Sequence, residues 1–295
     1  MTKSEDQAID PGMSRATSDP SDTPGRVFAF LFGALVYIGV WLILIYIVCF
    51  VGNFFGPVLE SEWADVLPLK SIDMGIEEPF WTALSINVLL LIILGAQHSI
   101  MPRPWFKQKI TKVVPIHLER STYIIFAIGA LSLLIWQWRP MTQVIWHVDY
   151  TPLRWVLNII QFGGWLTVLV ATFQVGHWKI FGVTQVLDYI RGKEYTRQHY
   201  VRLSPEFFEV GWPVTDKGLW YFARHPDFFG FCVAFWVAPT MTVGHLVFAI
   251  GLTIYIMIGI FFLETNLKEL YGTVYEEYVR VRSKIVPWFV RESRH

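Results

Sequence analysis

The chain alternates between long apolar stretches and shorter polar segments. Four stretches approach or exceed the length, about 20 residues, that an α-helix needs to cross a bilayer. They are Val27–Val51, Phe80–Gln97, Ser121–Trp138 and Trp155–Gly176. A further apolar stretch, Phe228–Leu263, is too long for one crossing, and polar residues and Pro239 interrupt it near Thr240–His245. The pattern predicts an all-α polytopic membrane bundle of about five crossings, the last a helix-turn-helix pair.

The composition agrees with a membrane protein. Hydrophobic residues make up 54% of the 295 residues and charged residues only 16%, against about 25% charged in a typical soluble domain. The formal net charge is zero, so no basic excess points to nucleic acid. Residues 1–26 are polar and are expected to form a disordered tail.

The positions of the cations predict how the chain lies in the membrane. The N-terminal tail and the segments 98–120, 177–227 and 264–295 carry three, five, seven and six Lys or Arg residues. The two remaining loops carry one and two. Cytoplasmic loops are enriched in Lys and Arg. We therefore expect both termini, and the loops richest in polar motifs, on the cytoplasmic side.

One candidate for chemistry lies where the loop 177–227 meets the next apolar stretch, in the run Tyr221-Phe-Ala-Arg-His-Pro-Asp-Phe-Phe-Gly230. Pro226 suits the first turn of a helix, whose free N–H groups favour an anion. Arg224 offers a planar fork that suits a carboxylate, and His225 can donate and accept hydrogen bonds. Taken alone, an Arg-His pair here is also typical of a membrane boundary.

A second candidate is Glu264, at the end of the last apolar stretch. An ionisable residue at membrane depth is costly and often functional, although the cost falls at a helix end. Apolar and aromatic residues then recur with helical spacing as far as Tyr278. This spacing predicts one helix over Glu264–Arg282, lying against the membrane surface or its own domain.

Together these two segments resemble the C-terminal half of the isoprenylcysteine carboxyl methyltransferase superfamily. The resemblance rests on Arg-His-Pro-x-aromatic-x-Gly, a membrane hairpin, and then Glu-x-x-Leu-x-x-x-aromatic-Gly-x-x-Tyr-x-x-Tyr. In that superfamily the motifs form an S-adenosylmethionine site beneath a cytoplasmic cap. The resemblance implies the same cofactor and the same kind of cap here.

The N-terminal half carries a third pattern, which includes Gln97-His98-Ser99, Glu119-Arg-Ser-Thr-Tyr123 and Phe181-Gly-x-x-Gln185. It resembles the NnrU-like half of membrane methanethiol S-methyltransferases, and the resemblance covers roughly residues 28–290. It implies a small apolar thiol as methyl acceptor, and a bacterial inner membrane as the location. The implied cofactor-binding residues are Gln185, Tyr221, Arg224, His225, Pro226, Phe229, Gly230, Glu264 and Tyr275.

The resemblance also divides the chain and suggests catalytic residues. It implies a four-helix NnrU-like region over 27–176, a cofactor-binding region over 177–290 and a short tail over 291–295. His98 and Glu264 are the catalytic candidates. His98 is either a general base for the thiol, whose pKa near 8.5 lies within reach of an imidazole, or a structural histidine. Glu119 and Arg120 are expected to pair. The histidines are scattered, so we expect no metal site.

Three residues depart from the family pattern: Leu263 where a glutamate is usual, Phe228 where a tyrosine is usual, and Asp227 at an apolar or small position. One hypothesis is that Asp227 supplies a lost negative charge near the sulfonium. Four functions stay open. They are methylation of methanethiol, methylation of another thiol or a lipid-borne nucleophile, haem binding through His98 as in NnrU-like carotene isomerases, and a non-catalytic scaffold or transporter role.

Overall fold

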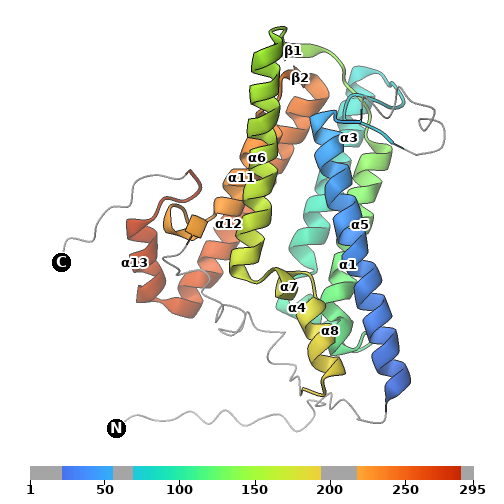
Figure 1. Ribbon diagram of the computed structural model, residues 1–295, viewed down its shortest axis with the longest axis vertical. Helices are drawn as coiled ribbons and strands as arrows, with labels where there is room; N and C mark the ends of the chain where they lie inside the picture. The colour runs from blue at the N-terminus through green and yellow to red at the C-terminus, as the bar shows by residue number, and fades with distance from the viewer. Residues whose placement is uncertain (1–21, 56–68, 194–217, 287–295) are drawn as a thin grey trace.

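The structure is a computed structural model that describes residues 22–55, 69–193 and 218–286. Within these residues the chain is mainly helical, and Figure 1 shows the helices as one elongated bundle. The elements are α1 (Thr23–Gly52), α3 (Phe80–Ile100), α4 (Pro104–Ile110), η1 (Ile116–Leu118), α5 (Glu119–Gln137), β1 (Val144–His147), α6 (Thr151–Val175), α7 (His177–Ile180), α8 (Val183–Ile190), η2 (Gly218–Tyr221), α11 (Pro226–Trp236), β2 (Thr240–Thr242), α12 (Val243–Tyr271) and α13 (Thr273–Val281).

Among the described residues, five helices are long and apolar enough to cross a membrane: α1, α3, α5 with the preceding η1, α6 and α12. Their outward faces are apolar, as with Leu35, Ile159 and Phe261, each about two-thirds exposed. Apolar side chains on the outside of a bundle suit lipid rather than water. The predicted all-α polytopic membrane bundle is confirmed.

The predicted helix-turn-helix pair is also present, as α11 and α12 joined through β2. Thr242 ends the turn, and its hydroxyl accepts a hydrogen bond from the backbone N–H of His245 at 3.2 Å, which caps α12. β2 pairs antiparallel with β1, whose residues lie in the loop between α5 and α6. Because α11 has only 11 residues, it rises about 16 Å, roughly half a bilayer.

Two helix boundaries differ from expectation. α1 begins at Thr23 rather than Val27, because the carboxylate of Asp22 accepts the backbone N–H of Gly25 at 2.9 Å and Pro24 fits the first turn. The single helix expected over Glu264–Arg282 is broken. α12 runs on to Tyr271, and Gly272, with a φ of 52°, turns the chain into α13. The rest of the expected N-terminal tail lies outside the described residues.

A pair of glycines brings α6 and α11 into close contact. A Cβ placed at Gly230 would lie 2.6 Å from the carbonyl oxygen of Gly164, and one at Gly164 would lie 2.7 Å from that of Gly230. Small residues at such crossings let helix backbones approach closely in a membrane. This contact holds α11 on the rest of the bundle and so determines where its first turn lies.

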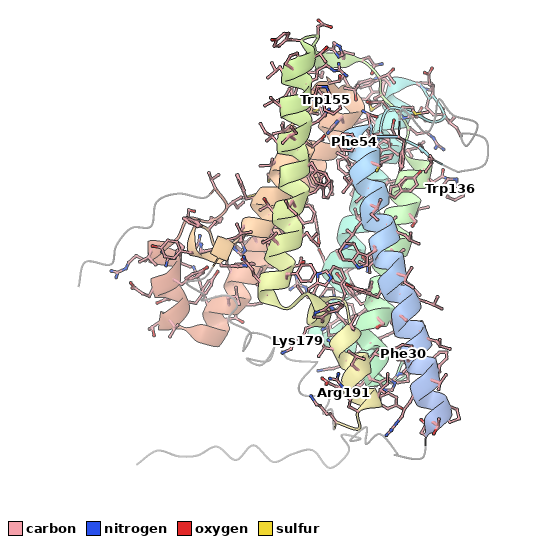
Figure 2. All side chains as sticks on the ribbon, in the orientation of Figure 1. Phe30, Phe54, Trp136, Trp155, Lys179 and Arg191 are labelled. Atoms are coloured by element: carbon pink, nitrogen blue, oxygen red, sulfur yellow. The ribbon has the colours of Figure 1, made fainter. Side chains whose placement is uncertain are left out.

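One hydrophobic core runs through both halves of the chain. It includes Phe50 of α1, Leu134 of α5, Phe235 of α11 and Phe248 of α12. The two ends of the bundle differ in the side chains they carry. In Figure 2, Trp136 and Trp155 lie towards the end where β1 and β2 pair, whereas Lys179 and Arg191 lie towards the other. We call these the strand end and the basic end.

Candidate functional site

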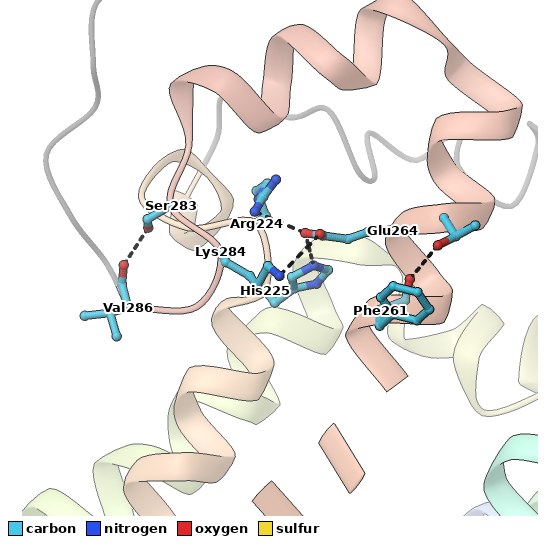
Figure 3. Close-up of polar contacts among 8 residues, drawn as sticks. Arg224, His225, Phe261, Glu264, Ser283, Lys284 and Val286 are labelled. Carbon is cyan, nitrogen blue, oxygen red and sulfur yellow. Dashed lines mark hydrogen bonds and ion pairs between the residues drawn. The ribbon is translucent and has the colours of Figure 1, made fainter. Parts of the chain in front are cut away.

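Two cations and an imidazole surround one carboxylate near the basic end of α12 (Figure 3). Glu264 Oε1 lies 3.2 Å from Nη2 of Arg224 and 3.1 Å from Nε2 of His225. Its other oxygen, Oε2, lies 3.8 Å from Nζ of Lys284. The group carries more positive than negative charge, so it is suited to a further anion. We call Glu264, Arg224, His225, Lys284 and Tyr275, which is described below, the Glu264 cradle.

Backbone pairing fixes the Arg-His-Pro segment on one side of the cradle. The backbone N–H groups of Arg224 and His225 donate to the carbonyl oxygens of Ser283 and Lys284 at 2.9 and 3.1 Å. Pro226 then opens α11, as its position in the sequence predicted. The residues after α13, 282–286, thus form a C-terminal strap beside the Arg-His-Pro segment, and the strap brings Lys284 to Glu264.

The turn at Gly272 supplies another wall. It folds α13 back so that Tyr275 and Tyr278 pack against Leu267 of α12, and all three side chains are buried. The Tyr278 hydroxyl donates to the backbone carbonyl of Trp220 at 3.1 Å, which ties α13 to the segment before Arg224.

Several buried polar atoms of the cradle have no hydrogen-bond partner within the described residues. These are Nε and Nη1 of Arg224, Nδ1 of His225 and the hydroxyl of Tyr275. The three side chains are almost fully buried, with Arg224 only 5% exposed. Burial, and then the nearby Glu264 carboxylate, raise the pKa of Tyr275. Unpaired buried polar groups are costly, and such a group calls for a partner.

The other residues implied by the resemblance lie at different distances from the cradle. The Phe229 N–H donates to the carbonyl oxygen of His225 at 3.2 Å, within the first turn of α11. Gly230 faces Gly164, so its contact is with α6. Tyr221 is 39% exposed, and the guanidinium of Arg282 lies over its ring at 4.4 Å. Asp227 has a buried Oδ1 without a hydrogen bond in the described chain.

Gln185 stands apart from the cradle. It lies on α8, where its side-chain amide donates to the backbone carbonyl of Lys179 at 3.1 Å. Figure 1 shows α8 well separated from α13 at the basic end. In the described chain, Gln185 is therefore not brought together with Arg224 or Glu264.

His98 lies near Tyr123 of α5 and Tyr255 of α12, with ring centroids 6.2 and 6.4 Å away. Its Nδ1 is 3.0 Å from the carbonyl oxygen of Leu94. Tyr255 and Glu264 are nine residues apart on α12, which corresponds to a rise of about 13 Å and a net rotation of about half a turn. His98 therefore faces the side of α12 opposite the cradle. We call His98, Tyr123, Tyr255, Arg103 and Arg120 the His98 cluster.

The remaining N-terminal motif residues pair differently from expectation. Glu119 lies 3.9 Å from Lys107 across the loop, and Arg120 instead donates to the carbonyl oxygen of Ile180 at 2.6 Å. An arginine next to a glutamate on a helix points about 100° away from it, so each side chain meets a different neighbour. The expected Glu119–Arg120 pair is not formed.

Sequence reasoning did not select Lys284, Ser283 or Trp220, which complete the surroundings of the cradle. Lys284 is one of six cations in the C-terminal segment, and spacing alone does not distinguish it from the others. Its role depends on the backbone pairing of the strap with the Arg-His-Pro segment. Within the described ranges, no group of three His, Cys, Asp or Glu side chains is arranged to hold a metal ion.

The fold and the cradle together define an integral membrane protein. It has a buried site, suited to an anion, at the basic end of its bundle. The sequence is 39% identical to methanethiol S-methyltransferase 1 of Bradyrhizobium diazoefficiens, over 91% of this chain and 86% of that protein. It is 38% identical to the methanethiol S-methyltransferase of Mycobacterium tuberculosis, over 89% of this chain and 97% of that protein. The chain belongs to the methanethiol S-methyltransferase family.

A more distant relative is nurim of Danio rerio, 25% identical over 60% of this chain and 62% of nurim. No protein-family model matches the sequence, and no solved structure matches it.

Proposed function

We propose that this protein transfers a methyl group from S-adenosylmethionine to methanethiol and releases dimethyl sulfide and S-adenosylhomocysteine. Family membership over about nine-tenths of the chain supports both the reaction class and the acceptor. The Glu264 cradle supports the donor.

The main support for this donor is that the unpaired polar groups of the cradle match the charged groups at the amino-acid end of S-adenosylmethionine. S-adenosylmethionine carries an α-carboxylate and an α-ammonium group on its methionine portion. Arg224 has two buried N–H-bearing nitrogens, Nε and Nη1, with no partner in the described residues, and these suit the carboxylate. Glu264 and the Tyr275 hydroxyl offer oxygen atoms for the ammonium group. The residues present therefore fit the donor.

Three of the other implied residues shape this site rather than contact the charged end of the donor. Pro226, Phe229 and Gly230 form the first turns of α11 beneath Arg224 and His225. The bound donor supplies an electrophilic methyl group on a sulfonium. The protein's part is to hold it in line with the thiol and to exclude water, because alignment and desolvation together lower the barrier to displacement.

The membrane setting suits the acceptor. Methanethiol is small and apolar and partitions into lipid, so a site beside α11 and α12 receives it from the bilayer. We place the basic end and both termini in the cytoplasm, because Lys and Arg concentrate in the loops of that end. The two methanethiol S-methyltransferases named above are bacterial, which supports a bacterial inner membrane.

The test uses purified full-length protein in detergent micelles with methanethiol and methyl-labelled S-adenosylmethionine, and mass spectrometry of dimethyl sulfide. Glu264→Gln removes the charge that Arg224, Lys284 and the His225 imidazole share, and we expect product formation to fall by about 100-fold or more. Glu277→Gln is the matched control, because Glu277 pairs with Arg280 at 2.7 Å on the exposed surface of α13. Absence of labelled product from the wild type would refute the proposed function.

A further inference from the structure

The thiol proton must leave before or during methyl transfer, because the thiolate and not the thiol is the effective nucleophile. The sequence motifs supply two histidines near the basic end that could accept this proton, His98 and His225. They differ in their partners and in the face of α12 that they approach.

We propose that His225, oriented by Glu264, is the general base that takes the proton of the thiol. The proposal rests on the proposed function and assigns the acceptor end of the same site. A carboxylate that holds one nitrogen of an imidazole while the other accepts a proton is a recurrent catalytic arrangement.

The hydrogen bond to Glu264 selects the tautomer of His225. A carboxylate can only accept, so the Nε2 atom that lies 3.1 Å from Glu264 Oε1 carries the hydrogen. In the neutral ring the lone pair then lies on Nδ1. That atom is buried and has no hydrogen-bond partner within residues 22–55, 69–193 and 218–286. An unpaired acceptor in a side chain that is 1% exposed is the group that a proton donor would satisfy.

The surroundings of His225 favour a desolvated thiolate. The Phe228 ring lies 5.5 Å from the imidazole. His225 is also the N-cap residue of α11, and the buried carboxylate of Asp227 in the first turn of that helix would stabilise the imidazolium that forms when Nδ1 takes the proton. Phe228 stands where the family usually has tyrosine, so the neighbour of the imidazole here carries no hydroxyl to compete for a proton.

The proton and electron balance is complete without a further reactant. The S–H bond of the thiol breaks, and its proton passes to Nδ1 of His225. The sulfur lone pair forms the new bond to the methyl carbon. The old bond between that carbon and the sulfonium breaks with its electron pair retained by the leaving sulfur. The imidazolium, paired with Glu264, then returns its proton to water.

His98 is the rival base, and its geometry is less suitable. Its Nδ1 is held by the backbone carbonyl of Leu94, which leaves Nε2 as the possible acceptor. The ring, however, packs beside Tyr255, on the face of α12 opposite Glu264. A thiol in contact with His98 would therefore be separated from a donor held by Arg224 and Glu264 by the body of α12.

The experiment separates the base from the donor site with two substitutions at one position. Glutamine places an amide N–H where Nε2 stands, so His225→Gln keeps the bond to Glu264 but removes the base. Asparagine is too short for that bond, so His225→Asn should lose donor binding as well. Donor-site integrity is measured separately, as the calorimetric affinity for S-adenosylhomocysteine.

Methaneselenol serves as a second acceptor of nearly the same size, because selenols are already ionised at neutral pH and need no base. For His225→Gln we expect kcat/KM to fall about 100-fold or more with methanethiol and less than about fivefold with methaneselenol. S-adenosylhomocysteine affinity should stay within about threefold of wild type, a smaller effect than the loss of one charged hydrogen bond.

An equal loss with both acceptors would overturn the assignment of His225. So would an acceptor-dependent loss in His98→Asn with none in His225→Gln. A wild-type protein that does not bind S-adenosylhomocysteine would instead refute the proposed function itself, and the two failures are therefore distinguishable.

Discussion

The Glu264 cradle and the His98 cluster both gather motif residues near the basic end, but they satisfy their polar groups differently. In the His98 cluster the cations and the imidazole meet backbone carbonyls and aromatic faces. Arg120 donates to Ile180 and lies over Tyr123, and Arg103 donates to Ser99 at 3.2 Å and lies over Phe262. In the cradle, one carboxylate contacts two cations and an imidazole, and four buried polar atoms have no partner in the described chain.

On the proposed function, this difference separates a structural polar cluster from a binding site. A cation that meets a carbonyl is satisfied within the fold, and no ligand is needed to offset its burial. A buried guanidinium with two unpaired nitrogens remains unsatisfied until an anion arrives. The comparison therefore predicts large effects on donor binding from the cradle, and effects on stability rather than binding elsewhere.

The largest expected effect follows from Arg224→Met. The change removes the proposed partner of the donor carboxylate and leaves Glu264 with one fewer cation, and each hydrogen bond to a charged group contributes about 1.5–3 kcal/mol. We expect S-adenosylhomocysteine affinity, measured by calorimetry, to fall about 100-fold or more. Arg103→Met, from the His98 cluster, is the comparison. An equal loss of affinity in that variant would show that the two regions do not differ in donor binding.

A medium effect is expected from Gly230→Ala, which tests whether this glycine packs or binds. The new Cβ would lie 2.6 Å from the backbone oxygen of Gly164, and backbone cannot move aside cheaply. We expect α11 to shift from α6 at a cost of about 1–3 kcal/mol in the free energy of unfolding, seen as a lower Tm in micelles.

The matched control is Gly163→Ala, on the same helix as Gly164, where a Cβ meets nothing within 4 Å among the described atoms. Its Tm should stay at or slightly above that of the wild type. If Gly230→Ala kept the wild-type Tm and lost only donor affinity, Gly230 would belong to the binding site instead.

The smallest effect concerns the strand end, where Lys70 donates to the carbonyl oxygens of Trp138 and Trp136 at 2.5 and 3.2 Å. Burial, and then repulsion by Arg139, lower the pKa of Lys70 from 10.5 to about 8. The folded protein therefore binds fewer protons than the unfolded chain between about pH 8 and pH 10.5, and stability rises with pH in that window.

We expect wild-type Tm to rise across this window relative to Lys70→Met, by the equivalent of no more than about 1 kcal/mol because Lys70 is only half-buried. If the Tm values of the two proteins changed with pH in parallel, Lys70 would not contribute to the pH dependence of stability. Donor affinity of Lys70→Met should match the wild type, since this end of the bundle lies far from the cradle in Figure 1.

Much of the fold could be predicted because the membrane imposes it on each segment separately. A run such as Phe80–Gln97 is apolar over the length of a bilayer and must be helical to satisfy its backbone, whatever its neighbours are. The break at Gly272 could not be predicted in the same way. Tyr275 and Tyr278 continue the helical spacing of α12, and only their packing onto Leu267 after a turn reveals that the chain reverses.

The candidate site was predicted in part. Arg224, His225 and Glu264 were selected from sequence motifs, and they do lie together. Gln185 and His98 were also selected from motifs, but they lie elsewhere. Spacing within a segment cannot tell which face of a neighbouring helix a side chain will meet. A half-turn of rotation on α12, between Tyr255 and Glu264, separates the two clusters.

By itself the sequence determined that this protein is a polytopic helical membrane protein with its cations concentrated in alternate loops, because hydropathy and charge act on each segment independently of the rest of the chain. The tertiary structure alone decided which atoms of Arg224 and His225 meet Glu264, and that Lys284 joins them. Those contacts join residues up to 40 positions apart. They depend on the close approach of Gly230 to Gly164, the turn at Gly272 and the backbone pairing of the C-terminal strap, and packing of this kind is a property of the assembled bundle.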